Sequence, residues 1–358
     1  MFCHKSVIVK WQTSPQLNLS STFQLVETIK GKNMKLIKST ITLALCSVFA
    51  QAAIADDAVN FYGKLNISLQ ASEEGDDSFN ELKSNASRVG VKGKYTLDTD
   101  YALEAIYKLE WQVNVDDDTK DTLTARNQWV GLRGGFGEVT IGRADTTLKV
   151  SQGKFDLFND YEGDLKHLFI GENRVTDSLT YKSPKFNNIQ FLASYILSED
   201  KDLDDPFSVG VAFGDMSLKK TNFFLSIARD ENMPTKVVTD GNKETLFLAN
   251  TRLTGMYKFG DFRVGGILTK SELTDSGKSE NGYAVNASYK IGSVLAKVQY
   301  QEFAGADAIN IGADYKLGKN TKVFAWYTDR EELVGGDGET IKAASQGTYF
   351  AIGMEQKF

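Results

Sequence analysis

The sequence predicts an all-β protein, a sixteen-stranded antiparallel barrel that spans a membrane, from three observations. Apolar and polar residues alternate with period two along most of the chain, which is the pattern of β-strands with two different faces. Residues 34–55 have the composition of a signal peptide. Residues 349–358 still alternate, so we expect the chain to end inside a strand at Phe358. A closed barrel gives such a strand no open edge, whereas a soluble sheet would expose it to aggregation.

The predicted signal peptide starts inside the chain. Residues 34–38 form its basic part, residues 41–49 form a short apolar core, and Ala53-Ile54-Ala55 is a small-x-small cleavage site. The apolar core is too short to span a bilayer. We therefore expect a barrel domain of residues 56–358. We interpret residues 1–33 as an upstream extension from an over-called start codon, and the alternative is a genuine leader extension.

Cysteine content and charge limit the chemistry. Cys46 lies in the apolar part of the signal, where we interpret it as a small hydrophobe and not as a lipoprotein acceptor, and Cys3 is the other cysteine. The predicted mature chain thus has no cysteine, which excludes disulfide scaffolds and thiolate metal sites. The whole chain has a net charge of −6; residues 1–55 carry six lysines and one glutamate, a net +5, so residues 56–358 carry −11. Such a chain does not seek nucleic acid.

Two kinds of connection alternate along the chain, and their number gives the strand count. Short turns rich in Gly, Asp and Asn alternate with longer charged segments, as transmembrane barrels require on their two sides. The short turns lie at 98–100, 134–137, 184–188, 214–215, 260–261, 292–293 and 318–320. The longer segments lie at about 72–86, 114–124, 145–172, 198–206, 230–244, 273–280, 304–307 and 330–346. These fifteen connections predict sixteen strands.

Residues 101–111 display the two faces most clearly, with tyrosine, leucine and tryptophan on one and Glu104, Lys108 and Glu110 on the other. In a soluble sandwich the apolar face would be the core, and locally the two interpretations are the same. Because the apolar face recurs on sixteen strands with no helical segment to cover it, we expect lipid outside and water inside. Aromatic residues near strand ends fit the girdles of a membrane barrel. They are Tyr95, Tyr101, Trp111, Trp129, Tyr181, Tyr195, Tyr257, Tyr289, Tyr300 and Tyr315.

Catalytic and metal-binding motifs are not found in residues 56–358. His167 is the only histidine there, and no serine lies in the context of a nucleophile elbow. The acidic segments 116–121 and 336–339 lack the spacing of a calcium loop and are interpreted as solvated. We expect no enzymatic activity, no cofactor and no metal. An outer-membrane hydrolase that uses His167 is the weaker alternative.

The longest connection, residues 145–172, carries the informative charges. Its acidic residues Asp156, Asp160, Glu162 and Asp164 are interleaved with Phe155, Leu157, Phe158 and Tyr161. The apolar side chains predict a loop that packs against the protein while it presents charge. Basic residues occupy the polar parity of several strands: Lys64, Arg88, Lys92, Lys94, Arg126 and Arg174. Facing an acidic loop across water, they would create a transverse field that screens solutes by charge.

Several motifs resemble those of the general diffusion porins of Gram-negative outer membranes, over essentially all of residues 56–358. They are Phe61-Tyr62-Gly63-Lys64, Ser87 to Gly93, Ala125 to Leu132, Ile141-Gly142-Arg143 and the terminal Phe358. The resemblance implies a homotrimer of sixteen-stranded barrels whose third loop folds inward as the pore constriction. It implies a basic side made by Lys64, Arg88, Arg126, Arg174 and, provided a bulge turns it inward, Arg143. It implies an acidic side made by Asp156, Asp160 and Glu162, with Asp164 in the same cluster.

Two features depart from the pattern of that family. The Pro-Glu-Phe-Gly run of enteric constriction loops is absent and Leu157 to Asp160 stands nearby, so which carboxylates reach the lumen stays open. Gln356 stands where an aromatic residue is usual in the terminal signature, although Phe358 is kept. The resemblance implies that Phe358 is the signal read by the barrel-assembly machinery.

The favoured function is a passive, water-filled channel of the outer membrane for small hydrophilic solutes and ions, limited by solute size and weakly selective for cations. Its expected partners are outer-membrane lipid and lipopolysaccharide, with periplasmic chaperones and the barrel-assembly machinery during biogenesis. One alternative is a substrate-specific outer-membrane channel. Another is a surface receptor or adhesin whose long acidic loops bind the partner.

Overall fold

The computed structural model of the chain describes residues 59–97, 101–116, 122–199, 204–239, 242–335 and 341–358. The predicted extension, the predicted signal peptide and the predicted start of the barrel at residue 56 lie outside the described residues. So do most of the acidic segment 116–121 and all of 336–339. Every described element belongs to one compact unit, Asp57–Phe358.

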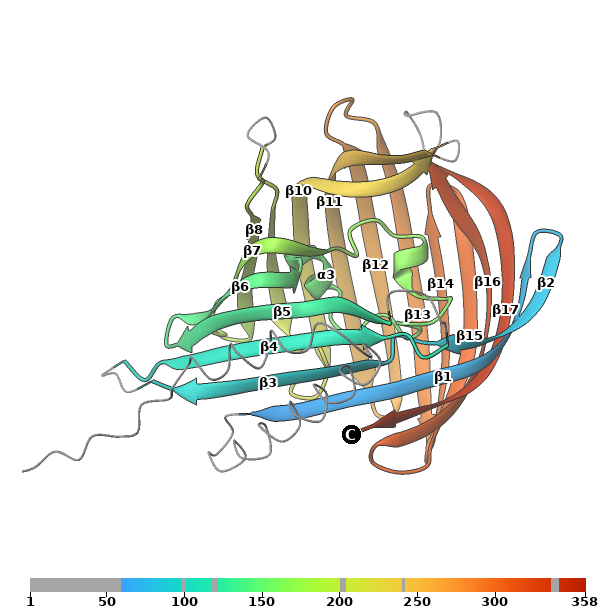
Figure 1. Cartoon of the computed structure of the whole chain (residues 1–358), viewed down its shortest axis with the longest axis horizontal. Helices are drawn as coiled ribbons and strands as arrows, with labels where there is room; N and C mark the ends of the chain where they lie inside the picture. The colour runs from blue at the N-terminus through green and yellow to red at the C-terminus, as the bar shows by residue number, and fades with distance from the viewer. Residues whose placement is uncertain (1–58, 98–100, 117–121, 200–203, 240–241, 336–340) are drawn as a thin grey trace, which may run out of the picture. The chain divides into compact units, whose positions relative to one another are not determined.

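The described part of this unit is an antiparallel β-sheet with two short helices (Figure 1). Its strands are β1 (Asn60–Glu74), β2 (Asp77–Ser84), β3 (Arg88–Thr96), β4 (Glu104–Val113), β5 (Leu123–Gly134), β6 (Gly137–Asp145), β7 (Arg174–Lys182), β8 (Ile189–Ile196), β9 (Phe207–Gly214), β10 (Phe223–Thr239), β11 (Asn242–Phe259), β12 (Phe262–Leu273), β13 (Ser279–Ile291), β14 (Val294–Phe303), β15 (Ala306–Lys316), β16 (Thr321–Gly335) and β17 (Ile341–Lys357). The helices are α3 (Thr147–Ser151) and the 3₁₀ turn η1 (Leu165–His167), both between β6 and β7. Among the described residues, no helix is long and apolar enough to cross a membrane.

The sheet closes on itself between its first and last strands. β1 pairs with β17 along a seam that starts at Lys64 and Lys357. On its other side β1 pairs with both β2 and β3, and from β3 to β17 each strand pairs with the next one along the chain. Beyond the seam, Gly63 and Phe358 exchange two backbone hydrogen bonds of 3.0 and 3.1 Å. A Cβ on Gly63 would lie 2.4 Å from the Phe358 ring, so the close approach needs glycine.

The strand count agrees with the prediction. β2 and β3 both pair with β1 and together make one barrel strand. They are separated at residues 85–87, where Ala86 takes a positive φ of 48°. The seventeen strands of the described chain therefore make a closed, antiparallel barrel of sixteen, as predicted.

The two faces of the strands are those that the alternation predicts. On β1, Phe61 and Leu69 are exposed on the outside by 55 and 61 %, whereas Asn66 and Gln70 are buried on the other side. On β17, Phe350 and Ile352 are likewise exposed. An apolar outer face with a polar inner face is the reverse of a soluble protein and suits lipid outside and water inside.

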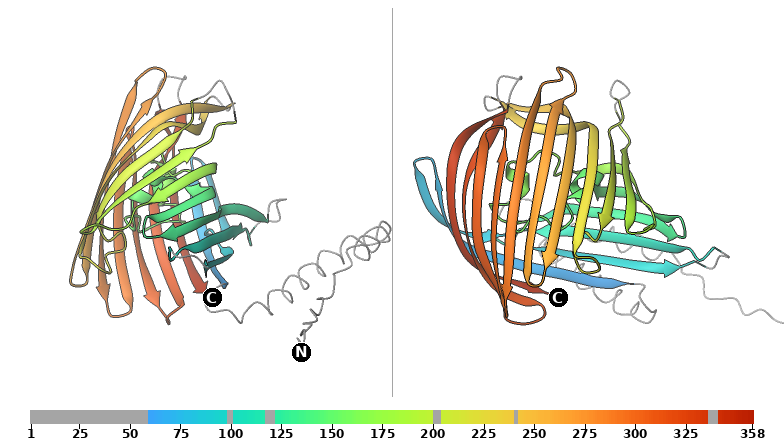
Figure 2. Two further views of the ribbon diagram at one scale, coloured as in Figure 1. Left: turned by 90° about the vertical axis from the view of Figure 1, so that its left-hand side faces the viewer. Right: turned by 180° about the vertical axis from the view of Figure 1, so that it is seen from behind.

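The strands are longer than predicted, and several predicted loops are hairpins. The predicted loop at 72–86 is largely the β1–β2 hairpin, which turns at Gly75 with a φ of 60°. The predicted loop 230–244 is largely a second hairpin, because β10 continues to Thr239 and β11 starts at Asn242 (Figure 2). Likewise, β16 and β17 extend through much of the predicted loop 330–346. The sequence interpretation was wrong here because a strand that continues into water can be polar on both faces, as a loop is. The backbone groups still pair across the hairpin.

The assignment of Trp129 to an outer girdle is also wrong. Val130 and Leu132 are exposed on the outer face of β5, whereas Gly131 pairs with Thr140, which is buried on the inner face. Side chains alternate between the two faces of a strand, so Trp129 lies on the inner face together with Gly131. The reason is an irregularity in the pairing of β4 with β5 at Leu109 to Trp111. An extra residue in one strand reverses the parity of the residues beyond it.

Candidate functional site

The segment between β6 and β7, residues 146–173, carries most of the candidate site. Thr146 caps α3 and accepts a hydrogen bond of 3.3 Å from the Lys149 N–H. Asp164 caps η1, where it accepts from the Lys166 N–H at 2.9 Å. These side-chain caps supply partners for backbone N–H groups that short helices leave unpaired. The segment therefore has a defined backbone in spite of its high charge.

One side of this segment is apolar and fully buried. Phe155 and Leu165 belong to a cluster with side chains of the β8 to β15 strands, and Phe158 and Tyr161 belong to a second cluster with Phe324 and Trp326 of β16. The Phe155 ring lies so close to β12 that a Cβ on Gly265 would be 2.9 Å from it. The prediction that the aromatic residues of this segment pack is confirmed.

Polar side chains of the same strands bind the backbone of the segment. Gln299 accepts from the Leu157 N–H at 3.0 Å and donates to the Gly163 carbonyl at 3.3 Å. Lys297 donates to the Leu157 carbonyl at 3.0 Å, and Asn286 donates to the Phe155 carbonyl at 2.6 Å. The Leu157 N–H and the carbonyls of Phe155, Leu157 and Gly163 thus have partners on the strands.

A buried ion pair holds the far end of the segment. The Arg252 guanidinium of β11 lies 2.5 Å from the Glu172 carboxylate and donates to the Ile170 carbonyl at 3.1 Å. Arg252 is fully buried and lies against the Phe169 ring. A buried charge without its partner is strongly unfavourable, so this pair fixes where the segment returns to the barrel wall.

Asp160 reaches the opposite strands. Its carboxylate lies 2.8 Å from the Lys64 Nζ of β1 and is bonded to the Arg88 guanidinium of β3. Burial opposes the ionisation of Asp160, but the charges of Arg88 and Lys64 outweigh it and lower its pKa to about 2. The structure thus brings one predicted acidic residue together with two predicted basic ones.

Glu162 has a different set of basic partners. It lies 2.7 Å from the Lys83 Nζ of β2, 3.2 Å from the Arg330 guanidinium of β16 and 3.9 Å from the His167 ring. Burial alone would raise the pKa of Glu162, but the charges of Lys83 and the other nearby cations outweigh burial and lower this pKa to about 2. Glu162 therefore stays charged at neutral pH, but these three partners do not belong to the predicted basic row.

Asp156 and Asp164 are bonded to the segment itself. Asp156 accepts from the Phe158 and Leu165 N–H groups at 2.9 and 3.0 Å, and Asp164 accepts from the Asp160 N–H at 2.8 Å. The Asp164 side chain is buried and that of Asp156 is partly buried. Desolvation together with the charge of Asp164 raises the pKa of Asp156 well above its ordinary value. These two residues organise the turn that presents Asp160 and Glu162.

The remaining predicted basic residues lie on neighbouring strands and pair within the wall. Arg126 donates to Glu110 at 3.0 Å and to Gln112 at 3.1 Å. Arg174 lies 3.0 Å from Asp145 and donates to Asn127 at 3.0 Å. The members of the basic row are thus each balanced by a neighbouring acid or amide.

Arg143 has the bulge that its predicted orientation requires. The pairing of β6 with β7 is irregular between Gly142 and Ala144, and Gly142 has a φ of 132°. Beyond this point Arg143 shares the parity of Asp145, which faces Arg174. The structure therefore provides the local geometry that brings Arg143 to the same face as the basic row.

A cavity of about 1010 Å³ separates the segment from the opposite strands. On the strands it is lined by Arg88, Lys108, Arg126 and Arg174, and on the segment by residues from Lys149 to Glu172. Both signs of charge face it, and its lining is more polar than apolar. A closed barrel with such a cavity can conduct water and small solutes.

The comparisons with known proteins agree with this architecture. A family profile described as Gram-negative porin matches residues 42–332. The chain belongs to the Gram-negative porin family. This porin is 26 % identical to the major outer membrane protein P.IB of Neisseria sicca, over 90 % of this chain and 99 % of that protein.

Solved structures share its fold. The anion-selective porin from Comamonas acidovorans has a TM-score of 0.69 at 20 % identity and covers 85 % of this chain and 100 % of its own. The trimer form of OmpT, an outer membrane protein of Vibrio cholerae, has a TM-score of 0.63 at 20 % identity with the same coverage. Membership of the family makes this porin a diffusion channel of the Gram-negative outer membrane.

Sequence reasoning missed the residues of the porin that hold the segment in place. Lys83 and Arg330 fell in predicted loops, and Arg252 and Lys297 were not singled out. The available signal was parity, because Lys297, Gln299 and Gln301 occupy alternate positions on β14. Parity identifies such residues as inward but does not name the segment that they bind.

His167 lies in the segment and faces charged neighbours. Burial and the nearby cations Arg330 and Lys166 lower its pKa to about 4, so its ring is neutral at neutral pH. Among the residues that the structure describes, no group of His, Cys, Asp and Glu could hold a metal ion. The hydrolase alternative gains no support from the family of this porin.

Proposed function

We propose that the diffusion path runs through the cavity between residues 146–173 and strands β3 to β7, and that this segment is the inward-folded constriction of the pore. The acidic side of the constriction is Asp160 and Glu162, positioned by Asp156 and Asp164. The basic side is Lys64, Arg88, Arg126 and Arg174, with Arg143 at its end. The observation that carries this proposal is the contact of Asp160 with Lys64 and Arg88, since it joins the segment to the opposite strands.

The path is size-limited and only weakly charge-selective. Equal numbers of basic and acidic side chains line the cavity, so the local field has two opposed sides and little net sign. The charge of −11 on residues 56–358 favours cations, and salt screens it beyond about 8–10 Å. We expect a small preference for cations, with no exclusion of anions.

The test is the reversal potential of the mature porin in planar bilayers under a salt gradient. Asp160→Asn with Glu162→Gln should shift the reversal potential toward anions, because two charged carboxylates leave the path. Asp156→Asn is the matched control and should leave the reversal potential nearly unchanged. The Asp156 carboxyl binds the N–H groups of Phe158 and Leu165, and its raised pKa disfavours the charged form. Arg88 and Arg126 replaced together by Ser should shift it toward cations and raise the conductance.

All of these shifts should shrink at high salt. If the double variant at Asp160 and Glu162 leaves both selectivity and conductance untouched, the segment does not line the path and the assignment of the constriction is wrong. A folded barrel without any conductance would contradict the channel itself.

The porin assembles as a homotrimer, surrounded by outer-membrane lipid and lipopolysaccharide. The fold that it shares with a trimeric outer membrane protein supports this assembly. Chemical cross-linking of the detergent-solubilised porin should give a ladder that ends at three subunits. A ladder that stops at one subunit would contradict it.

Biogenesis uses the signal peptide of residues 34–55, periplasmic chaperones and the barrel-assembly machinery. The Phe358 side chain is 64 % exposed on the outer face, where a receptor for the terminal signature could reach it. N-terminal sequencing of the porin from outer membranes should start at Asp56, and no peptide from residues 1–33 should be found. Phe358→Ala should lower the yield in the membrane without changing the conductance of the molecules that fold.

A further inference from the structure

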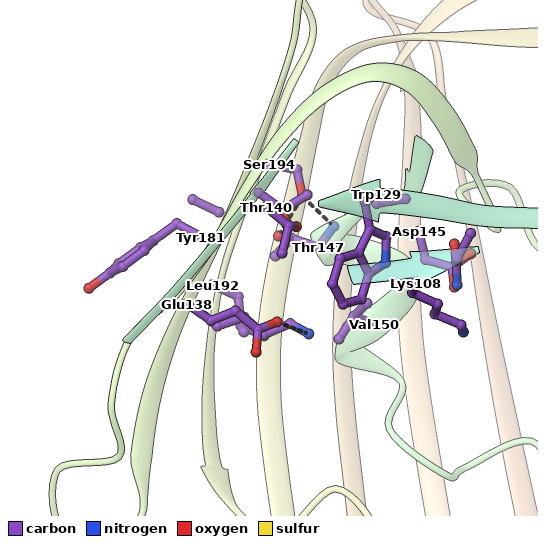
Figure 3. Close-up of a pocket in the computed structure, with 15 residues that line it drawn as sticks. Lys108, Trp129, Glu138, Thr140, Asp145, Thr147, Val150, Tyr181, Leu192 and Ser194 are labelled. Carbon is purple, nitrogen blue, oxygen red and sulfur yellow. Dashed lines mark hydrogen bonds and ion pairs between the residues drawn. The ribbon is translucent and has the colours of Figure 1, made fainter. Parts of the chain in front are cut away.

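A second, smaller pocket lies on the inner face of strands β5 to β8 beside α3 (Figure 3). Its volume is about 190 Å³. Trp129, Thr140 and Lys182 line it from the strands, and Thr147 and Val150 line it from α3. We call this pocket the alcove.

The alcove adjoins the proposed diffusion path. Lys108, Asn127, Asp145 and Val150 line both the alcove and the larger cavity. A solute in the cavity therefore has the alcove directly at its side. Glu138 and Lys182 mark the other end of the alcove, next to the tight turn at residues 135–136 and near Pro184.

One part of the alcove is flat and apolar. The Trp129 ring lies between Thr147 and Lys108, above Val150, and Leu192 adds to the apolar lining (Figure 3). Trp129 is only partly buried, and in the described part of the chain its indole N–H has no acceptor. A tryptophan that only filled space in a core would be buried and would usually have a hydrogen-bond partner.

The other part of the alcove is polar but electrically balanced. Glu138 pairs with Lys182 at 3.6 Å, Lys108 pairs with Glu110 at 3.2 Å, and Asp145 pairs with Arg174 at 3.0 Å. Hydroxyl groups are present in pairs, with Thr140 and Thr180 at 2.5 Å and Thr147 and Ser194 at 2.9 Å. Each charge thus has an opposite charge beside it, and each hydroxyl has a neighbour.

This combination selects the class of ligand. A free ion would have to compete with the partner that each charge already has, so the alcove offers no strong site for an anion or a cation. Paired carboxylates, ammonium groups and hydroxyls keep lone pairs and N–H or O–H groups that can bond a neutral hydroxyl. A flat indole beside them suits the C–H face of a saturated ring. At about 30 Å³ per water, the volume corresponds to about six waters, which is close to one six-membered sugar ring.

We propose that the alcove is a binding subsite for one neutral, polyhydroxylated ring, a monosaccharide in its pyranose form. The ring stacks on Trp129, and its hydroxyls bond Asp145, Lys108 and the Thr140–Thr180 pair. Weak binding beside the path raises the local concentration of the solute without trapping it, which favours flux at low solute concentration. The inference rests on the proposed diffusion path, because only that path brings the solute to the alcove.

The experiment measures the ion current of single mature porins in planar bilayers while D-glucose is added. Binding in the lumen should lower the current in a saturable way. Sorbitol, which has the same hydroxyl groups without a ring, should lower the current only in proportion to its effect on the conductivity of the solution. Equilibrium dialysis of labelled glucose against the detergent-solubilised porin should give the same half-saturating concentration, on the order of millimolar.

Variants locate the binding. Trp129→Ala should raise the half-saturating glucose concentration about tenfold in both measurements, since it removes the stacking surface. Trp111→Ala is the matched control and should leave it unchanged, because Trp111 pairs with the outward-facing Val89 on the other side of the wall. Thr180→Val, which keeps the shape of the side chain, should raise it severalfold and serves if Trp129→Ala does not fold.

The outcomes separate this proposal from that of the path. Conducting channels without a saturable glucose effect overturn the subsite and leave the channel intact, whereas folded porin without conductance overturns the path. If Trp129→Ala and Trp111→Ala raise the half-saturating glucose concentration equally, glucose binds elsewhere and the proposed subsite is wrong. Saturable block by glycine betaine with none by glucose overturns the neutral ring in favour of a zwitterion.

Discussion

The two sides of the barrel treat residues 146–173 in opposite ways. Strands β10 to β16 bury its aromatic side chains and bind its backbone through Lys297, Gln299 and Asn286. Strands β3 to β7 are separated from most of it by the cavity and pair their charges mainly with one another. The segment thus packs against β10 to β16 as in a protein core, whereas β3 to β7 present a polar surface to the cavity.

This difference explains how one segment can be both rigid and charged. Contacts on the packed side supply the free energy that orders the segment, so the open side needs only Asp160, bonded to Lys64 and Arg88, to set the distance across the path. A loop held by ion pairs alone would gain little, because exposed pairs contribute about 0–1 kcal/mol. The division predicts that stability and selectivity respond to different substitutions.

The largest effect is expected on the packed side. Phe155→Ala should lower the free energy of unfolding by about 3–5 kcal/mol, because it leaves a cavity in a fully buried cluster. The measurement is unfolding by guanidinium in lipid vesicles, together with proteolysis of residues 146–173. The control Phe186→Ala removes a ring that is 60 % exposed and should cost about 0.5 kcal/mol or less. Equal effects would show that the segment is not held by this cluster.

A smaller effect is expected where the segment meets the open side. Asp160→Asn removes two charged hydrogen bonds and should lower stability by about 2 kcal/mol at pH 7. The pKa of Asp160 is lowered to about 2, so its stabilisation is present above its ordinary pKa and is lost as the pH falls through about 2. Protease protection of the segment should therefore fall with acidification in the wild type. The same fall in Asp160→Asn would assign the pH dependence to other groups.

The smallest effect is expected at His167. Because its pKa is lowered to about 4, the ring is neutral at pH 7, and His167→Gln should change stability by about 0.5 kcal/mol or less there. Below its ordinary pKa the unfolded chain takes up a proton that the folded ring resists, so wild-type stability should decline relative to the variant as the pH falls toward about 4. Unfolding curves at several pH values measure this difference. Hydrolysis of lipid or peptide that His167→Ala abolishes would instead revive the enzyme alternative.

The sequence predicts the barrel well because the alternation of apolar and polar residues within a strand is enough to assign its two faces. The alternation in β1 and β17 places Phe61, Leu69 and Phe350 outside without reference to any other part of the chain. Trp129 was misassigned because one irregular pairing in β4 and β5 reverses parity, and such irregularities depend on both strands. The inward orientation of Arg143 could be predicted only on the condition that a bulge is present, because the irregular pairing involves β7 as well as β6.

The candidate site could be predicted only as a set of charges. Asp156 and Asp160 are four residues apart in an acidic stretch and look alike in the sequence, yet the first binds N–H groups of the segment itself and the second is bonded to Lys64. The Arg252–Glu172 pair joins residues 80 positions apart, and no local pattern announces it. Parity marks a side chain as inward, but the partner that it meets depends on how the segment crosses the barrel.

The seam between β1 and β17 has a consequence for how the molecule folds. It joins the first barrel strand to the last, so it is the contact of greatest sequence separation in the ring and cannot form while the chain is still being made. The entropy lost on closing so long a loop grows only with the logarithm of its length, but the time needed to find the pairing is long. Until β17 docks, two strand edges with unpaired N–H and C=O groups stay open. The precursor is therefore most exposed to aggregation before the seam closes, and in the finished barrel the facing edges of β1 and β17 are paired with each other.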